Sequence, residues 1–151
     1  MVQLPFLISA DMKQAESQED DVSIEGMRIL LAEDNELNMK IAEFLLTNAG
    51  AEIIRASNGK EAVEASAKSG VGEVNVILMD IMMPVMDGLE ATREIRTMNR
   101  SDASAVVIIA MTANAFTEDK TKALKSGMDD YLTKPLESEK LIRALSRYKY
   151  N

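Results

Sequence analysis

Five residues carry the functional groups that a metal-assisted phosphoryl-transfer site requires. Glu33 and Asp34 are adjacent carboxylates, Asp80 is a third, and Thr112 and Lys134 add a hydroxyl and an ammonium group. Three carboxylates brought together raise one another's pKa values unless a cation lies among them. Because histidine and cysteine are absent, the expected cation is hard, namely Mg²⁺ with Mn²⁺ as a substitute.

Such a set of groups can form an acyl phosphate. One carboxylate acts as the nucleophile, the metal ion neutralises phosphoryl oxygens, and the lysine and threonine stabilise the developing negative charge. Each group alone also has an ordinary structural interpretation. Glu33 and Asp34 could cap a helix, Asp80 and Thr112 could be turn residues, and Lys134 could be a solvated surface charge. The coincidence of all five favours the chemical interpretation.

Short apolar runs alternate with amphipathic segments along most of the chain. The runs predict strands at residues 27–32, 52–56, 74–80, 105–111 and 130–133. The amphipathic segments predict helices at residues 35–49, 61–68, 89–98, 117–125 and 137–148, with Gly50 and Gly127 just beyond two of their ends. This alternation predicts an α/β fold.

The expected architecture is a doubly wound, flavodoxin-like sheet of five parallel strands with five helices, in the strand order 2-1-3-4-5. In such sheets ligands bind beyond the carboxyl ends of the strands. Glu33 and Asp34 follow the first predicted strand, Asp80 ends the third, and Thr112 and Lys134 follow the fourth and fifth. We therefore expect all five side chains at one rim of the sheet.

Composition excludes several other kinds of chemistry. The chain has no histidine and no cysteine, which rules out Ser-His-Asp catalysis, thiolate catalysis and disulfides. Any phosphohistidine must therefore lie on another molecule or domain. The net charge of −8 argues against nucleic-acid binding. No apolar run reaches about 18 residues, so we expect no membrane contact. The absence of cysteine is compatible with a reducing compartment, and we expect a cytoplasmic location.

The acidic charge is concentrated at the amino terminus, which predicts a domain boundary. Residues 1–26 hold six acidic side chains against one lysine, a net charge of −5, which leaves −3 for the rest. We interpret residues 1–26 as an arm or acidic linker and residues 27–151 as one domain. Residues 2–8 are apolar and resemble the last strand of a preceding domain; alternatively they dock on this domain or on a second copy.

Residues 27–148 resemble the receiver domain of two-component response regulators, and most closely the receivers of hybrid sensor histidine kinases. The resemblance rests on four groups of residues in family order and spacing: Leu31–Asn35 with Asn38, Met79–Pro84 with Asp87 and Gly88, Met111–Ala113, and Lys134–Pro135. It implies a phosphorelay function, in which Asp80 is the phosphoacceptor. Asp34, Asp80 and the Met82 carbonyl would bind Mg²⁺, with Glu33 acting largely through water.

The resemblance also implies a conformational switch. Lys134 would pair first with Asp80 and then with the phosphoryl group, while Thr112 would move to hydrogen-bond it and Tyr131 would turn inward. The switching face would comprise the fourth helix, the fifth strand and the fifth helix, and it could mediate a dimer. Pro135 would follow a cis peptide bond. The side chains of Met82 and Asn114 would tune the lifetime of the phosphoryl group.

The implied partner is a histidine kinase or a histidine phosphotransfer domain that carries phosphohistidine. Contact is expected at the first helix, where Leu37, Asn38 and Ile41 form a partly apolar surface if they are exposed. Alternatively Leu37 and Ile41 face the sheet and only Asn38 is exposed. The sequence leaves these two arrangements open, and it does not encode the sensed signal, the cognate kinase or the output.

Other functions predict residues that this chain lacks. A phosphatase of the haloacid-dehalogenase type needs a second aspartate two residues after its nucleophile, where Met82 stands. An FMN-binding flavodoxin needs a first loop that accepts phosphate, which Glu33 and Asp34 would repel. A module that has lost phosphorylation is disfavoured, because every expected site position is filled. A stand-alone response regulator remains an alternative to part of a hybrid kinase. Receivers catalyse their own phosphorylation and dephosphorylation, so whether to class the chain as an enzyme stays open.

Overall fold

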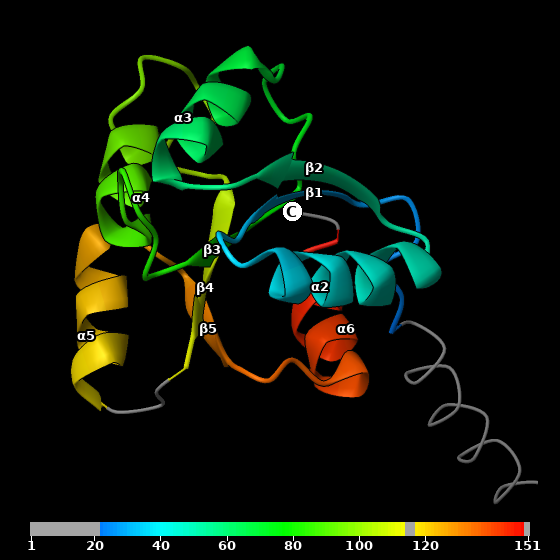
Figure 1. Cartoon of the computed structure of the whole chain (residues 1–151). Coiled ribbons are helices and arrows are strands. Elements are labelled where there is room, and N and C mark those ends of the chain that lie inside the picture. Colours follow the sequence, from blue (N-terminus) through cyan, green and yellow to red (C-terminus); the bar gives the residue numbers. More distant parts are fainter. Residues whose placement is uncertain (1–21, 114–116, 150–151) are drawn as a thin grey trace, which may run out of the picture.

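The computed structural model describes residues 22–113 and 117–149, and its centre is one parallel β-sheet (Figure 1). The strands are β1 (Arg28–Ala32), β2 (Glu52–Ala56), β3 (Val76–Asp80), β4 (Val107–Thr112) and β5 (Asp130–Thr133). They pair in the order β2-β1-β3-β4-β5, and each neighbouring pair is parallel. The predicted flavodoxin-like topology is therefore confirmed.

Helices cover both faces of the sheet. They are α2 (Glu36–Asn48), α3 (Gly59–Lys68), α4 (Gly88–Arg96), α5 (Thr117–Ser126) and α6 (Ser138–Ser146). Buried side chains of α2 and α6 form one core with the first face, while those of α3, α4 and α5 form a second core with the other face. Figure 1 shows the same two layers, with α2 and α6 lying side by side.

The strand sequences explain why both faces are covered. Every residue of β3 and of β4 is buried, as expected for central strands of a parallel sheet. Successive side chains of β1 alternate between the two cores, with Ile29 and Leu31 in one and Leu30 and Ala32 in the other. A continuous apolar run therefore supplies buried side chains to both hydrophobic cores.

Side-chain caps fix where three of the helices begin. The Oδ1 atoms of Asn35, Asn58 and Asp87 accept hydrogen bonds from the backbone N–H three residues later, at 2.9, 2.9 and 2.8 Å. Each cap satisfies one of the unpaired N–H groups of a helix's first turn. Since α2 starts at Glu36, only Asp34 and Asn35 separate the side chain of Glu33 from the helix.

Packing with the domain extends upstream of the predicted boundary at residue 27. Ile24 is fully buried in the core beneath α2 and α6, and the N–H of Gly26 donates to the carbonyl oxygen of Gly50 at 2.9 Å. The apolar segment at residues 2–8 lies outside the described residues. Among the described helices, none has the length and apolarity needed to cross a bilayer.

Candidate functional site

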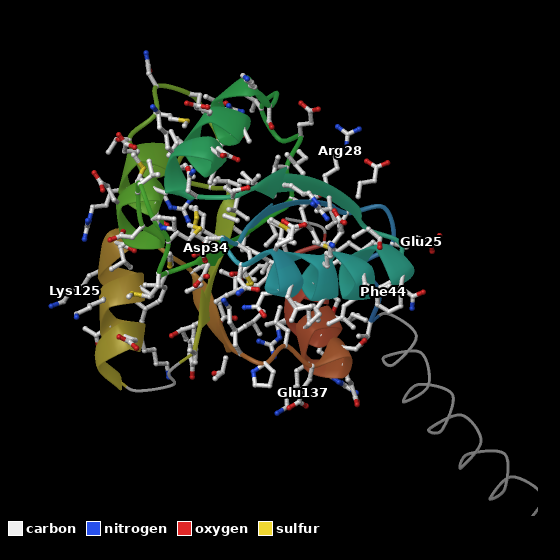
Figure 2. The ribbon with its side chains drawn as sticks, viewed as in Figure 1. Glu25, Arg28, Asp34, Phe44, Lys125 and Glu137 are labelled. Carbon is white, nitrogen blue, oxygen red and sulfur yellow. The ribbon has the colours of Figure 1, made fainter. Side chains whose placement is uncertain are left out.

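Three carboxylates meet where the parallel strands end. Oxygen atoms of Glu33, Asp34 and Asp80 all lie within 4.8 Å of one another. Glu33 and Asp80 are only 3% and 6% exposed, whereas Asp34 is exposed to solvent beside the start of α2 (Figure 2). Because Asn35 caps α2, Asp34 is not used as the helix cap. The all-oxygen donor set fits a hard divalent cation such as Mg²⁺.

Lys134 links two of these carboxylates. Its Nζ atom donates to Oε2 of Glu33 at 2.6 Å and to Oδ2 of Asp80 at 3.0 Å. Glu33 is held from its other side, because Oε1 accepts the backbone N–H of Asn35 at 3.1 Å. The backbone N–H of Lys134 donates to the Thr112 carbonyl at 2.8 Å, which ties the ends of β4 and β5 together. The peptide bond from Lys134 to Pro135 is cis.

Burial and charge crowding shift the pKa of two of these groups. Desolvation raises the pKa of Asp80 to about 6; the hydrogen bond from Lys134 opposes this shift, and the nearby charge of Glu33 adds to it. Burial alone would lower the pKa of Lys134, but its hydrogen bonds to Glu33 and Asp80 outweigh that effect and raise the pKa. Three carboxylates meet one ammonium group here, so the site has an excess of negative charge that a divalent cation would neutralise.

The loop after Asp80 is held close to the strand. The N–H of Gly88, at the start of α4, donates to the carbonyl oxygen of Ile81 at 2.9 Å. A Cβ atom at Gly88 would overlap the carbonyl oxygen of Asp80 and lie 2.9 Å from Cγ of Met79. The absence of a side chain at position 88 thus lets α4 begin directly behind the candidate phosphoacceptor.

The middle of the same loop is exposed and tightly turned. The N–H of Met82 lies 3.4 Å from Oδ1 of Asp80, and the Met82 side chain points into solvent. Val85 has a positive φ of 69°, and the N–H of Met86 donates to the carbonyl oxygen of Pro84 at 2.7 Å across it. Such a conformation is rare for a β-branched residue. The metal-binding role of the Met82 carbonyl stays a prediction.

The predicted switch residues lie on the adjoining strands. Thr112 is buried at the end of β4, on the rim that holds Asp80. Tyr131 is half-buried on β5, and Nζ of Lys120 on α5 lies 4.7 Å from the centre of its ring. Asn114 lies outside the described residues.

One side of α2 bears a row of exposed apolar side chains that we call the α2 stripe: Leu37, Ile41 and Phe44. They are 66%, 47% and 67% exposed, while other residues of the helix face the sheet. Of the two arrangements that the sequence left open for Leu37 and Ile41, the structure has the exposed one. Phe44 was not predicted, although its spacing from Leu37 and Ile41 is the signal that could have identified it. A groove of about 400 Å³ runs from Ile41 past Asn38 to Lys134.

The fold and the site together define a class: a flavodoxin-like domain with an acidic, lysine-bridged pocket at the carboxyl rim of its sheet. The family model for the response regulator receiver domain matches residues 29–146. The chain belongs to the receiver domain family of two-component signalling.

Related proteins are many times longer than this chain, and several of them are hybrid histidine kinases. "Hybrid signal transduction histidine kinase I" of Dictyostelium discoideum is 41% identical over 121 residues, which cover 79% of this chain and 7% of that protein. "Sensor protein GacS" of Pseudomonas syringae pv. syringae is 36% identical over 128 residues, covering 84% of this chain and 14% of that protein. The chain thus spans a small part of each relative's length.

Solved receiver structures have the same fold. The receiver domain of sensor histidine kinase PA1611 from Pseudomonas aeruginosa PAO1, with a magnesium ion coordinated in its active site cleft, is 39% identical with a TM-score of 0.75, covering 83% of this chain and 99% of that one. The receiver domain of the Saccharomyces cerevisiae response regulator Ssk1, in complex with the phosphotransfer protein Ypd1, is 32% identical with a TM-score of 0.73. This match covers 83% of this chain and 90% of that one.

Proposed function

We propose that Asp80 accepts a phosphoryl group from a phosphohistidine on another protein or domain. The observation that supports this best is the convergence of Glu33, Asp34 and Asp80 at one rim, with Lys134 bridging two of them. Mg²⁺ would be held by Asp34, Asp80 and the Met82 carbonyl, with Glu33 acting through water, and it would neutralise the phosphoryl oxygens during transfer. Mn²⁺ has similar ligand preferences and would substitute.

Each side chain of the site has its own role in phosphoryl transfer. An oxygen of the ionised Asp80 carboxylate forms a bond to phosphorus as the bond from phosphorus to the donor imidazole nitrogen breaks. Lys134 then exchanges its hydrogen bond to Asp80 for one to a phosphoryl oxygen. The Thr112 hydroxyl donates to another phosphoryl oxygen once it moves toward the rim. Later attack by water on phosphorus releases phosphate, and Met82 and Asn114 would set its rate.

Phosphorylation would act as a switch through the last two strands. Thr112 on β4 and Lys134 after β5 would both respond to the new charge, and Tyr131 lies on β5 two residues before Thr133, which pairs with Thr112. The face formed by α5, β5 and α6 would change conformation, and a dimer could form through it. The shift is limited by how differently the phosphoryl group interacts with the two conformations.

Incubation with Mg²⁺ and beryllofluoride or acetyl phosphate tests the proposal. We expect saturable uptake with amide chemical-shift changes centred on Asp80, Thr112 and Lys134. No response would refute the receiver function. Turnover of simple phosphate esters would instead favour the phosphatase alternative, although Met82 stands where that mechanism needs an aspartate as general acid. Visible absorbance would indicate a bound flavin.

Metal binding should weaken as the pH falls through about 6. A proton and the metal ion compete for the Asp80 carboxylate, whose pKa is raised to about 6. Lowering the pH from 8 to 5 should reduce the apparent Mg²⁺ affinity by about tenfold. Calorimetric titration measures this directly. An affinity that stays constant over that range would contradict this prediction.

The α2 stripe and the neighbouring groove would receive the helix of a phosphotransfer partner. Replacing Ile41 and Phe44 with lysine should slow transfer from a phosphohistidine donor about tenfold or more, because buried apolar anchors dominate such interfaces. Phosphorylation by acetyl phosphate should stay unchanged. The matched control is Leu124→Lys, an exposed apolar residue on α5. Equal effects of the two changes would argue against recognition through α2.

We further propose that this receiver is part of a cytoplasmic hybrid histidine kinase. The hybrid kinases among its relatives support this origin. A stand-alone response regulator is the alternative. Transfer rates from a panel of phosphorylated kinases and phosphotransfer domains discriminate between them, because a receiver tethered to its donor should react slowly with most free donors.

A further inference from the structure

A basic row lines a groove on the outer edge of the sheet. The groove has a volume of about 600 Å³, with β5 forming one wall and α6 the other. Lys140, Arg143 and Arg147 project from the α6 wall at helical spacing, so they follow one side of the helix. We call these three residues the basic row. The groove is lined by Lys134 and this row against two carboxylates, Asp130 and Glu137, so it carries an excess of positive charge in a chain whose net charge is −8.

The partners of the basic row within the domain hold it weakly. The charged nitrogen atoms of Lys140, Arg143 and Arg147 lie 3.6, 3.4 and 4.0 Å from carboxylate oxygen atoms of Glu137, Glu139 and Asp130, respectively. All three basic side chains are largely exposed. Ion pairs of this kind contribute little to stability. Each guanidinium group also presents five N–H donors, so it can donate hydrogen bonds to further carboxylates without losing its present partner.

The first described residues lie near one end of this row, because Glu25, Gly26 and Met27 line a small pocket together with Lys149, two residues after Arg147. Ile24 is buried in the same core cluster as Leu141 and Leu145 of α6, so the chain is anchored there two residues after Val22. Glu19, Asp20 and Asp21 immediately precede Val22 in the sequence. Three extended residues span about 10 Å, and the seven-residue step from Lys140 to Arg147 also covers about 10 Å along a helix.

We propose that the acidic segment at residues 11–21 docks in the groove of its own chain, with its Glu19–Asp21 cluster against the basic row. The charges are complementary, and the covalent connection keeps the two at a high effective concentration, so weak ion pairs suffice. Tyr131 lines the same groove. If the proposed function holds, the docked segment would also cover part of the face that changes on phosphorylation, whereas the docking itself does not depend on phosphorylation.

A spin label tests the docking in the full chain. The chain has no cysteine, so Ser17→Cys gives one attachment site for a nitroxide. We expect amide signals of β5 and α6 to lose intensity at about 0.01 M ionic strength, where charges interact over about 30 Å, and to recover at about 1 M, where they interact over about 3 Å. Loss centred on the α2 stripe, or none that depends on salt, would overturn the proposal.

Charge reversal supplies the matched control. Arg143→Glu with Arg147→Glu should reduce the paramagnetic effect about threefold or more, and adding Glu19→Lys, Asp20→Lys and Asp21→Lys should restore it. Lys122→Glu with Lys125→Glu on α5 is the control, since Lys125 points away from the domain on the opposite layer (Figure 2). Equal loss in both reversed proteins would overturn the proposal, because it would mean that only overall charge matters.

A mixed sample identifies whose segment is bound. Spin-labelled chain without ¹⁵N is combined with ¹⁵N-labelled chain without the spin label. We expect no loss of signal in β5 and α6 of the ¹⁵N chain, because each groove is occupied by its own segment. Loss in this sample would assign the groove to the segment of a second copy and would overturn docking within one chain. None of these readouts involves Asp80, so their failure is distinguishable from failure of phosphorylation.

Discussion

Asp80→Asn should abolish stable phosphorylation by acetyl phosphate and by phosphohistidine donors. The amide of asparagine matches the size of the carboxylate but lacks its nucleophilic charge, and it removes one proposed metal ligand. The variant should fold normally, since it removes a buried charge whose raised pKa of about 6 shows that ionisation is disfavoured there. Phosphate-affinity electrophoresis and intact mass spectrometry measure the loss.

Asp87→Asn is the matched control for this result. This variant makes the same substitution, aspartate to asparagine, at another position of the loop. Asp87 caps α4, because its Oδ1 atom accepts a 2.8 Å hydrogen bond from the N–H of Glu90. Asparagine is an equally good cap, so the helix should persist and phosphorylation should continue. Phosphoryl uptake by the Asp80→Asn protein would place the acceptor elsewhere, and loss in both proteins would point to loop damage.

Gly88→Ala should strongly destabilise the domain although it adds only one methyl group. Its Cβ atom would overlap the carbonyl oxygen of Asp80 and lie 3.0 Å from the carbonyl carbon. The strand cannot retreat easily, because β3 pairs with β1 on one side and β4 on the other. Alanine gains about 1 kcal/mol of helix propensity over glycine, but overpacking against backbone atoms costs about 3 kcal/mol, so the net effect is destabilising.

Urea and thermal denaturation measure the effect of this change. A net loss of about 2 kcal/mol should lower Tm by roughly 4–8 °C in a domain of this size. Gly70→Ala is the control, because a Cβ atom there meets only the flexible carboxylate of Glu73 at 3.1 Å. Phosphorylation of Gly88→Ala should also slow, since the clash displaces the strand end that carries Asp80. Equal stability of the two variants would show that α4 moves away at little cost.

Much of the fold was predictable because its elements obey simple periodicities. Buried strands appear as continuous apolar runs, and the strand ends then collect Glu33, Asp34, Asp80, Thr112 and Lys134 at one rim. Element ends shifted by a few residues, since fraying and caps decide them locally; the last helix was predicted to residue 148 and ends at Ser146.

The orientation of α2 was not predictable in the same way. The helix carries apolar residues on every side, so periodicity alone cannot say whether Leu37 or Met39 faces the sheet. The short contact between Lys134 and Glu33 was also missed. It depends on how two side chains extend toward each other from the ends of β1 and β5, which have β3 and β4 between them, and sequence spacing does not contain that information. Likewise, the sequence Asp87-Gly88 does not show that the carbonyl group of Asp80 lies against Gly88.

The division of α2 into two sides has a consequence for how such domains diversify. Met39, Ala42 and Leu46 carry the packing against the sheet, while the exposed Leu37, Ile41 and Phe44 contribute little to it. Surface substitutions usually change stability by no more than about 0.5 kcal/mol. If a partner binds the α2 stripe as proposed, substitutions at these outward residues would change which partner binds while the fold stays intact, so duplicated copies of such a domain would come to serve separate pathways.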